Sequence, residues 1–213
     1  GNATHIATSD AVLIIPASAS MIGRIANGMT DTPASALVAS HMGSKNPVLF
    51  LPNMHLSLSE SPAVDANIKK IESFGAIRLQ SRNEEGKNKF LDPKILADLV
   101  GNELNRSKTE DHPVLITMGS TRGYIDDVRY VSNYSSGKLG SLVSEELFRL
   151  GYATHVVSGP CPNKPHIYKK LQNTLTNDEM EKEALAAIRQ GAKAAVMAAS
   201  VLDFTPIEKK SGK

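Results

Sequence analysis

Short apolar runs alternate with stretches of helical periodicity along the whole chain. The runs are rich in branched residues and predict buried strands at 11–15, 48–51, 76–79, 114–117, 153–157 and 194–198. Between them, apolar residues at three- and four-residue steps predict helices at 21–29, 63–74, 93–104, from about 139, and at 178–190. Strands that alternate with helices indicate parallel sheets covered by helices on both faces.

A polar segment at 105–113, NRSKTEDHP, interrupts this alternation. It has no apolar periodicity, so we expect a domain boundary there, with one domain over 1–106 and a second over 107–213. We therefore predict an α/β fold of two Rossmann-like or flavodoxin-like three-layer domains, each built on a parallel sheet. Asp92, just before a proline, is expected to cap the helix at 93–104.

Composition and charge limit the classes of function that the chain could have. The net charge of the 213 residues is +2, which is too small to favour binding to nucleic acid or to an anionic membrane. No apolar run reaches the roughly 18 residues of a membrane span, and the first residues lack the basic-then-apolar order of a signal peptide. The single cysteine, Cys161, excludes an intrachain disulfide and fits the reducing cytoplasm. The histidines lack metal-ligand spacing, so no metal site is predicted.

The stretch 114–140 joins a strand to two small-residue turns and then to a helix. Bare backbone amides with one cation are how proteins hold phosphates, most favourably at a helix N-terminus. Both turns belong to one half of the chain, so we expect them to converge on one crevice at the carboxyl ends of the strands. The residues expected to bind an anion there are Gly119, Ser120, Thr121, Arg122, Arg129, Ser135, Ser136, Gly137 and Lys138. The spacing is not that of a Walker A loop, so a flexible serine-rich loop is the alternative.

Three further strand ends carry candidate chemistry. The small residues at 16–20, PASAS, would let a flat ring or a phosphate approach the backbone. An ordinary strand-to-helix turn with an N-cap serine is the alternative. His55 follows the second strand and could act as an acid–base group, although a lone loop histidine is more often only solvated. Asp203 ends a small-residue strand at 194–204, where it could bind a ribose, a base or a metal, or simply cap the strand.

Taken together, these segments resemble the bifunctional phosphopantothenoylcysteine decarboxylase/phosphopantothenate–cysteine ligase family of coenzyme A biosynthesis. The second half resembles the ligase at 114–140, at 155–160 (HVVSGP) and at 197–204. The resemblance implies an enzyme that joins 4′-phosphopantothenate to L-cysteine through an acyl-cytidylate, using CTP with Mg²⁺. It implies that Asn133 acts at the acyl-nucleotide and that Lys213 is the catalytic lysine. It also implies contacts to the nucleotide from Met197, Ala198, Ala199, Asp203 and Phe204.

The first half resembles the flavin-dependent decarboxylase domain of the same family. This resemblance implies FMN as a cofactor and His5 as an active-site histidine. It implies flavin contacts from Pro16, Ala17, Ser18, Ala19 and Ser20. The sequence departs from the family pattern at three points. Histidine stands at 55 where the substrate-binding asparagine is expected, serine stands at 20 where the flavin motif has asparagine, and 81–90 has no cysteine at the place of the family's acid.

The resemblance begins within one family domain and stops within the other, so both domains are expected to be incomplete. It implies small-molecule substrates and a homo-oligomer, with dimers formed through the ligase half and higher oligomers through the flavin half. The departures leave open a non-catalytic flavin- or nucleotide-binding regulatory protein of the same family. A nucleotide-binding α/β module with another reaction is a third reading, and VRYVSN at 128–133 favours CTP over ATP.

Overall fold

The computed structural model describes residues 9–79, 82–84, 87–89, 92–106 and 112–212. The chain divides into two compact units, Gly1–Leu96 and Ala97–Lys213. His5 and Lys213, two of the predicted catalytic residues, lie outside the described residues. No helix in the described ranges combines the length and apolar character that crossing a membrane requires.

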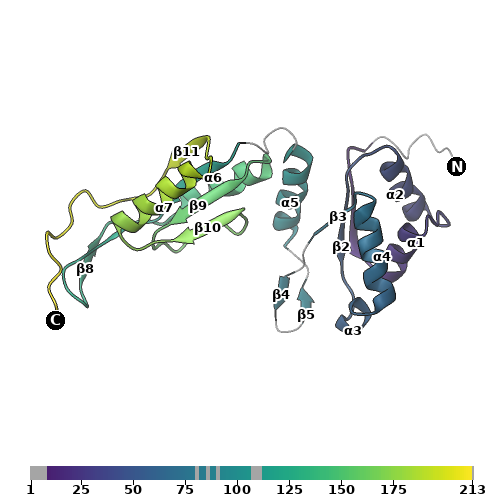
Figure 1. Cartoon of the computed structure of the whole chain (residues 1–213), viewed down its shortest axis with the longest axis horizontal. Coiled ribbons are helices and arrows are strands. Elements are labelled where there is room, and N and C mark those ends of the chain that lie inside the picture. The colour runs from purple at the N-terminus through teal and green to yellow at the C-terminus, as the bar shows by residue number, and fades with distance from the viewer. Residues whose placement is uncertain (1–8, 80–81, 85–86, 90–91, 107–111, 213) are drawn as a thin grey trace. The chain divides into compact units, whose positions relative to one another are not determined.

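The first unit contains a three-stranded parallel sheet. Its strands, in spatial order, are β1 (Val12–Ala17), β2 (Val48–Pro52) and β3 (Ile77–Arg78). Each coincides with a predicted run, and β2 is buried along its whole length, as expected of an inner strand of a parallel sheet. The helices that share one hydrophobic core with this sheet, on one side of it in Figure 1, are α1 (Ala19–Ala26), α2 (Pro33–Gly43) and α4 (Pro62–Ser73).

The sequence pattern does not predict α2, because its apolar residues are not confined to one helical face. The start of this helix is nevertheless encoded locally. The Thr32 hydroxyl accepts the Ser35 amide at 3.1 Å, and the Ser35 hydroxyl accepts the Thr32 amide at 3.2 Å. This reciprocal pair is a capping box, and Pro33 occupies the first helical position, where its missing N–H is harmless. The pattern also misses a one-turn helix, α3 (Leu56–Ser59), and the hairpin of β4 (Arg82–Glu84) with β5 (Lys87–Lys89).

Helix α5 (Pro93–Asn105) begins at the predicted cap, where the Asp92 carboxylate accepts the Lys94 amide at 2.8 Å. From Ala97 onward its residues belong to the second unit, whereas the predicted boundary at 106 placed the whole helix in the first. The reason is its packing on the end of α6 (Lys138–Arg149), where the Asn102 side-chain amide donates to the Phe148 carbonyl at 2.6 Å.

The second unit is built on a four-stranded parallel sheet. Its strands, in spatial order, are β10 (Lys170–Asn173), β9 (Thr154–Ser158), β6 (Val114–Met118) and β11 (Ala194–Met197). Successive side chains of β6 point to opposite faces. Met118 contacts Gly140 in α6, and Leu115 packs with Ala184 in α7 (Asn177–Arg189). Helices therefore cover both faces, which confirms the predicted three-layer arrangement in this half.

Two strands of this unit differ from the prediction. The pattern does not predict β10, because its sequence KLQN offers no apolar run and the strand lies exposed at one edge of the sheet. The strand predicted to reach Asp203 ends at Met197. Beyond it the Ala198 amide still donates to the Thr117 carbonyl at 3.0 Å, and the Ser200 amide donates to the Gly119 carbonyl at 2.7 Å.

An antiparallel hairpin connects the end of β6 to α6. It consists of β7 (Arg122–Tyr124) and β8 (Tyr130–Ser132), and Figure 1 shows it running together with the C-terminal segment away from the sheet. The Lys210 amide donates to the Ile125 carbonyl at 2.9 Å, which joins this segment to the hairpin.

Candidate functional site

The ends of β6 and β9 touch through bare backbone. Gly119 has a φ of 78°, and a Cβ built there would lie 2.5 Å from the Gly159 carbonyl oxygen. A Cβ on Gly159 would lie 1.8 Å from the Ser120 carbonyl oxygen, so this contact requires glycine on both sides. The amide and the hydroxyl of Ser120 both donate to the Pro160 carbonyl at 3.1 Å. The two strand ends are thereby packed directly against each other, main chain on main chain.

The predicted anion loop lies where the sequence places it, at the start of α6. Gly137 is the N-cap residue, with a φ of 71° and no side-chain hydrogen bond to the helix, and the exposed Lys138 is the first helical residue. The Ser136 carbonyl accepts the amide of Asn163 at 3.2 Å and its side-chain amide at 2.8 Å. Because Ser120 also bonds to Pro160, both predicted turns contact the segment that follows β9.

The segment after β11 closes onto the same region. The Thr121 side chain is fully buried, and its hydroxyl accepts the Leu202 amide at 3.0 Å. This hydroxyl therefore holds the backbone of the segment after β11 in place. The half-buried Asn133 donates its side-chain amide to the Val201 carbonyl at 2.8 Å. Its Oδ1 atom has no hydrogen-bond partner among the residues that the structure describes. The Ser132 hydroxyl links the turns further, by donating to the Thr121 carbonyl at 2.8 Å.

The two predicted arginines are already engaged on the hairpin. The Arg122 guanidinium lies 4.4 Å from the centre of the Tyr130 ring, within cation–π range. Arg129 pairs with Asp126 at 2.7 Å. The backbone amides of Arg129 and Val128 also donate to Asp126, at 2.7 and 2.9 Å. These hydrogen bonds, led by the one from the Arg129 amide, lower the pKa of Asp126 to about 2. Sequence reasoning did not single out this buried carboxylate, which fixes the turn between β7 and β8.

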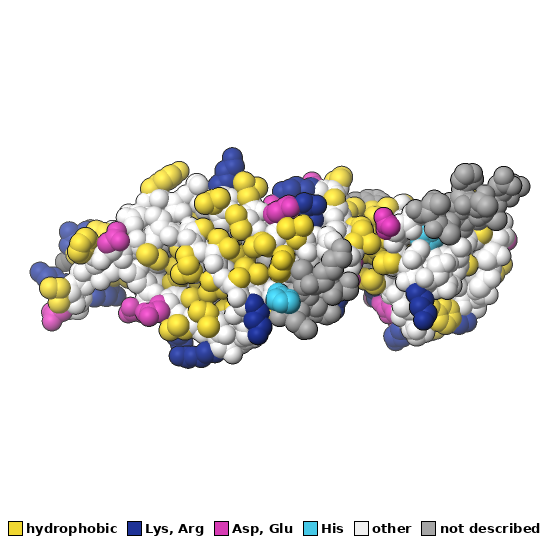
Figure 2. All heavy atoms as spheres, turned by 90° about the horizontal axis from the view of Figure 1, so that it is seen from above, with side chains coloured by type: hydrophobic (Ala, Val, Ile, Leu, Met, Phe, Trp, Pro, Cys, Tyr) yellow, Lys and Arg dark blue, Asp and Glu magenta, His cyan; other side chains and the backbone are white. Residues whose placement is uncertain are grey.

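A cavity of about 410 Å³ opens between α7 and the β11 edge of the sheet. Met197 and Ala199, two of the predicted nucleotide contacts, line it together with Thr117. It lies on the α7 face, whereas the anion loop begins α6 on the other face, so these two side chains do not point toward the loop. Asp203 and Phe204 are exposed, and Figure 2 shows many hydrophobic side chains on the visible face of the second unit.

In the first unit, the predicted flavin loop and His55 share the carboxyl edge of the sheet. The Asn53 amide donates to the Ala17 carbonyl at 3.3 Å, which ties the two loops together. Ser18 is the N-cap of α1 and its hydroxyl accepts the Met21 amide at 3.2 Å. The serine therefore takes the capping role that was the alternative reading. His55 is exposed and precedes α3 without a side-chain hydrogen bond to it.

One cluster of ionisable groups was not expected from the sequence. His166 lies between two buried carboxylates, with Nε2 3.0 Å from Asp98 and Nδ1 2.5 Å from Glu145. The three residues come from α5, α6 and the segment before β10, so only the folded chain brings them together. Within the described ranges, no group of three or more His, Cys, Asp or Glu side chains could hold a metal ion. The cluster therefore joins α5 to the second unit.

Comparisons with known proteins match both halves of the chain. Residues 2–105 match the family model described as flavoprotein, and residues 109–213 match the DNA/pantothenate metabolism flavoprotein C-terminal domain. The coenzyme A biosynthesis bifunctional protein CoaBC of Thermococcus kodakarensis is 33% identical over 204 residues, which cover 94% of this chain and 49% of that protein. A cysteine/cysteine sulfinic acid decarboxylase of an unknown prokaryotic organism is 29% identical over 211 residues, 93% of this chain and 58% of that protein.

Among solved structures, the C-terminal domain of a CoaBC protein is 32% identical to this chain. The match covers 46% of this chain and 49% of that one, with a TM-score of 0.42. The chain spans about half the length of the curated CoaBC relatives that it matches.

Proposed function

Since the chain belongs to the flavoprotein family that includes the CoaBC proteins, we propose that the natural protein acts in coenzyme A biosynthesis. Its second unit would contribute to the CTP-dependent joining of 4′-phosphopantothenate to L-cysteine. The observation that carries this proposal is the start of α6, where the exposed Lys138 follows the N-cap residue Gly137 and the Ser136 hydroxyl accepts the Lys138 amide at 3.3 Å. Such a helix start suits the phosphates of a nucleotide, because the helix dipole and the positive charge of Lys138 both favour an anion.

The described residues suit distinct roles in this reaction. Ser135, Ser136, Gly137 and Lys138 would bind phosphate oxygens at the start of α6. Mg²⁺ bound with the CTP would neutralise the pyrophosphate leaving group. Asn133 is held by Val201 through its amide nitrogen and keeps its Oδ1 atom available, which suits a residue that positions the acyl-nucleotide.

The remaining predicted residues would complete the nucleotide site. Asp203 and Phe204 are exposed and could contact the ribose and base, with Lys213 as the catalytic lysine. The main chain of 197–199, more than its side chains, would face the nucleotide. Arg122 would remain a candidate for the phosphate of phosphopantothenate, while Arg129 would act only if it exchanged Asp126 for the ligand.

We propose FMN as the cofactor of the first unit. The residues at 16–20 fit the edge of a flavin ring, because they are small and lie at the carboxyl end of β1, where α1 begins. A bound flavin would supply two-electron chemistry to a decarboxylation. In this chain the exposed Ser18 would position the ring, while the fully buried Ala17 would support the loop from within the core. His55 would contact the carboxyl end of the substrate in place of the asparagine that the family uses there.

Pyrophosphate release tests the ligase proposal. The natural protein is given CTP, Mg²⁺, L-cysteine and 4′-phosphopantothenate, each left out in turn. We expect release that requires both CTP and phosphopantothenate, and product that also requires cysteine. ATP in place of CTP should give much slower release. An intact, folded protein that releases no pyrophosphate under these conditions would refute the proposal.

A second candidate is a non-catalytic flavin-binding regulatory protein. It is favoured by His55 at the place of the substrate-binding asparagine and by the lack of cysteine at 81–90. A purified protein with a bound-flavin absorption spectrum, no decarboxylation and no pyrophosphate release would support this candidate. A colourless protein that binds CTP would support the ligase instead.

A further inference from the structure

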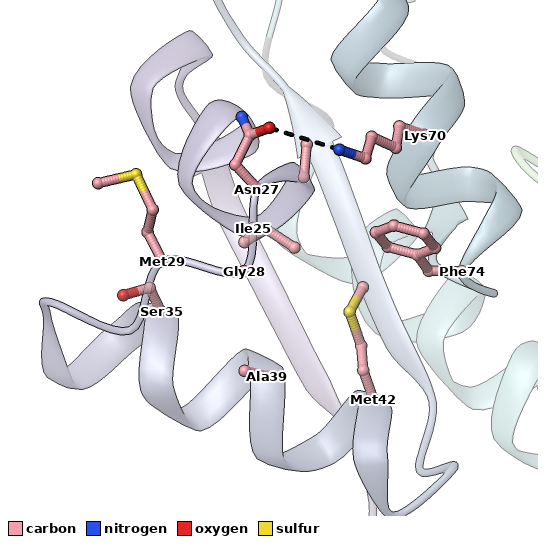
Figure 3. A pocket seen from close by; sticks show the side chains of 10 residues that line it. Ile25, Asn27, Gly28, Met29, Ser35, Ala39, Met42, Lys70 and Phe74 are labelled. Atoms are coloured by element: carbon pink, nitrogen blue, oxygen red, sulfur yellow. Dashed lines mark hydrogen bonds between the residues drawn. The ribbon is translucent and has the colours of Figure 1, made fainter.

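A cavity of about 460 Å³ lies in the first unit between α1, α2 and α4 (Figure 3). Its volume falls within the range of roughly 300–1,000 Å³ that is usual for small-molecule sites. The side chains that decide its chemistry are Ile25, Met29, Ala39, Met42, Phe74 and Lys70.

This cavity is separate from the predicted flavin loop. Helix α1 begins next to Ser18 at the carboxyl edge of the sheet and ends at the cavity. Its eight residues span about 12 Å, and the cavity therefore lies toward the opposite edge of the sheet. A ligand bound there would not compete with a flavin at 16–20.

The walls of the cavity are apolar and partly open to solvent. Figure 3 shows Met42 of α2 and Phe74, at the end of α4, on facing walls of the cavity. Phe74 is 52% exposed and Met29 is 48% exposed, so both keep apolar surface open to solvent at the cavity. Methionine side chains are flexible and polarisable, so such a wall adapts to an apolar chain.

One unneutralised cation stands at the rim. The Lys70 ammonium forms no salt bridge with any described residue, and it donates only a long hydrogen bond of 3.4 Å to Asn27 Oδ1 within the described ranges. Its neighbour Lys69, in contrast, pairs with Asp65 at 2.7 Å. Among the described residues that line the cavity, Lys70 is the single charged side chain.

The ends of α1 and α4 also face this region and bring partial negative charge. Carbonyl groups in the last turn of each helix are hydrogen-bonded by the chain that follows, since the Met29 amide donates to the Arg24 carbonyl and the Gly75 amide donates to the Glu72 carbonyl, each at 2.9 Å. The full positive charge of Lys70 therefore outweighs the partial negative charges at the two helix ends. It decides the sign of the charge that a ligand should carry.

We propose that this cavity binds a small amphipathic carboxylate. Its carboxylate would pair with Lys70 Nζ, and its apolar chain would lie between Met42 and Phe74. This is a second ligand site of the first unit, and it does not depend on the reaction proposed above.

Methionine methyl signals provide a direct test, because the chain has only seven methionines. The whole chain, labelled with ¹³C at the methionine methyl groups, is titrated with octanoate and followed by NMR. Substitution of Met29 and Met42 by leucine, one at a time, assigns their signals. We expect both signals to shift and saturate with one dissociation constant, while Met118 and Met180 of the second unit stay unchanged.

Matched ligands and variants decide the chemistry. Octanol and octylamine keep the chain and change the head, and acetate keeps the head without the chain; each should bind more weakly than octanoate. Lys70→Ala should weaken octanoate binding by about two- to fivefold, as expected for one partly exposed ion pair, whereas Lys69→Ala should leave it unchanged.

Three results would overturn the proposal. The first is the lack of a saturable shift at Met29 and Met42. The second is any sign that the Lys70 charge does not select a carboxylate, seen either as equal binding of octanoate and octylamine or as equal effects of the Lys69 and Lys70 substitutions. The third is a shift of the same signals with protein concentration alone, which would assign this apolar surface to a second copy of the chain.

Discussion

The contact between Gly119 and Gly159 predicts a large loss of stability for Gly159→Ala. The added methyl group would lie 1.8 Å from the Ser120 carbonyl oxygen, whereas real Cβ atoms essentially never come closer than 3.0 Å. The turns after β6 and β9 must therefore separate by about 1.2 Å in a close-packed region. Such a shift disrupts the hydrogen bonds from Ser120 to Pro160 and from the Gly159 amide to the Met118 carbonyl. At about 1 kcal/mol for each of three bonds, the free energy of unfolding should fall by roughly 2–4 kcal/mol.

The chain contains a natural probe for this measurement. It has no tryptophan, and its tyrosines all lie in the second unit, at 124, 130, 134, 152 and 168. Urea unfolding followed by tyrosine fluorescence therefore reports on the second unit alone, and linear extrapolation gives the free energy of unfolding. The same assay applies to every stability variant in this half of the chain.

Gly191→Ala is the matched control. Gly191 has a φ of 101°, but a Cβ there would meet nothing within 4 Å. This substitution should cost about 1–2 kcal/mol from backbone strain alone. Gly159 is not in the left-handed region, so its loss must come from the clash. A decrease below about 0.5 kcal/mol for Gly159→Ala would refute the reasoning that the two turns are locked together.

Three further predictions concern single side chains. Because its pKa is lowered to about 2, Asp126 should stabilise the fold above about pH 4 and lose this effect as the pH falls toward 2. Asp126→Asn should therefore flatten the pH dependence of urea unfolding in that window, and an unchanged profile would contradict the assignment. Thr176 accepts the Glu179 amide at 3.2 Å as the cap of α7, so Thr176→Ala should lower stability by about 1 kcal/mol and Thr176→Ser should not. Asn133→Asp should let the acyl-nucleotide accumulate, detected by mass spectrometry of quenched reactions, and unchanged turnover would remove Asn133 from that role.

The strands were predictable where burial left a clear trace in the sequence. Inner strands such as β2 and β6 are buried on both faces, and this requires continuous apolar runs. Edge strand β10 has no such requirement, and its sequence KLQN resembles a loop. Helix α2 escaped prediction for a related reason, since its apolar residues are not confined to one face and only the Thr32–Ser35 capping box identifies its start.

The position of a predicted loop in the fold followed from the sequence where one short segment contains all of the information. The loop that ends at Gly137 is such a case, because small residues directly before an amphipathic helix already indicate a helix start with little side-chain cover. Gly159 could not be recognised in this way. Its need for glycine depends on Ser120, which is distant in sequence and meets it only after β6 and β9 pair. Asp126 is similar, because its partners are backbone amides that carry no sequence signature.

The strand order also has a consequence for how the second unit folds. The pairing of β6 with β9 needs a connection that contains only the hairpin and α6, whereas Val114 of β6 must find Ala194 of β11 across all the intervening elements. Closing a longer loop lowers the chain entropy more, so the β6–β11 ladder should form late and open early. The segment that follows β11 carries Val201 to Asn133. The candidate active site would therefore be assembled in the last step of folding, and local opening of one edge strand would be enough to take it apart.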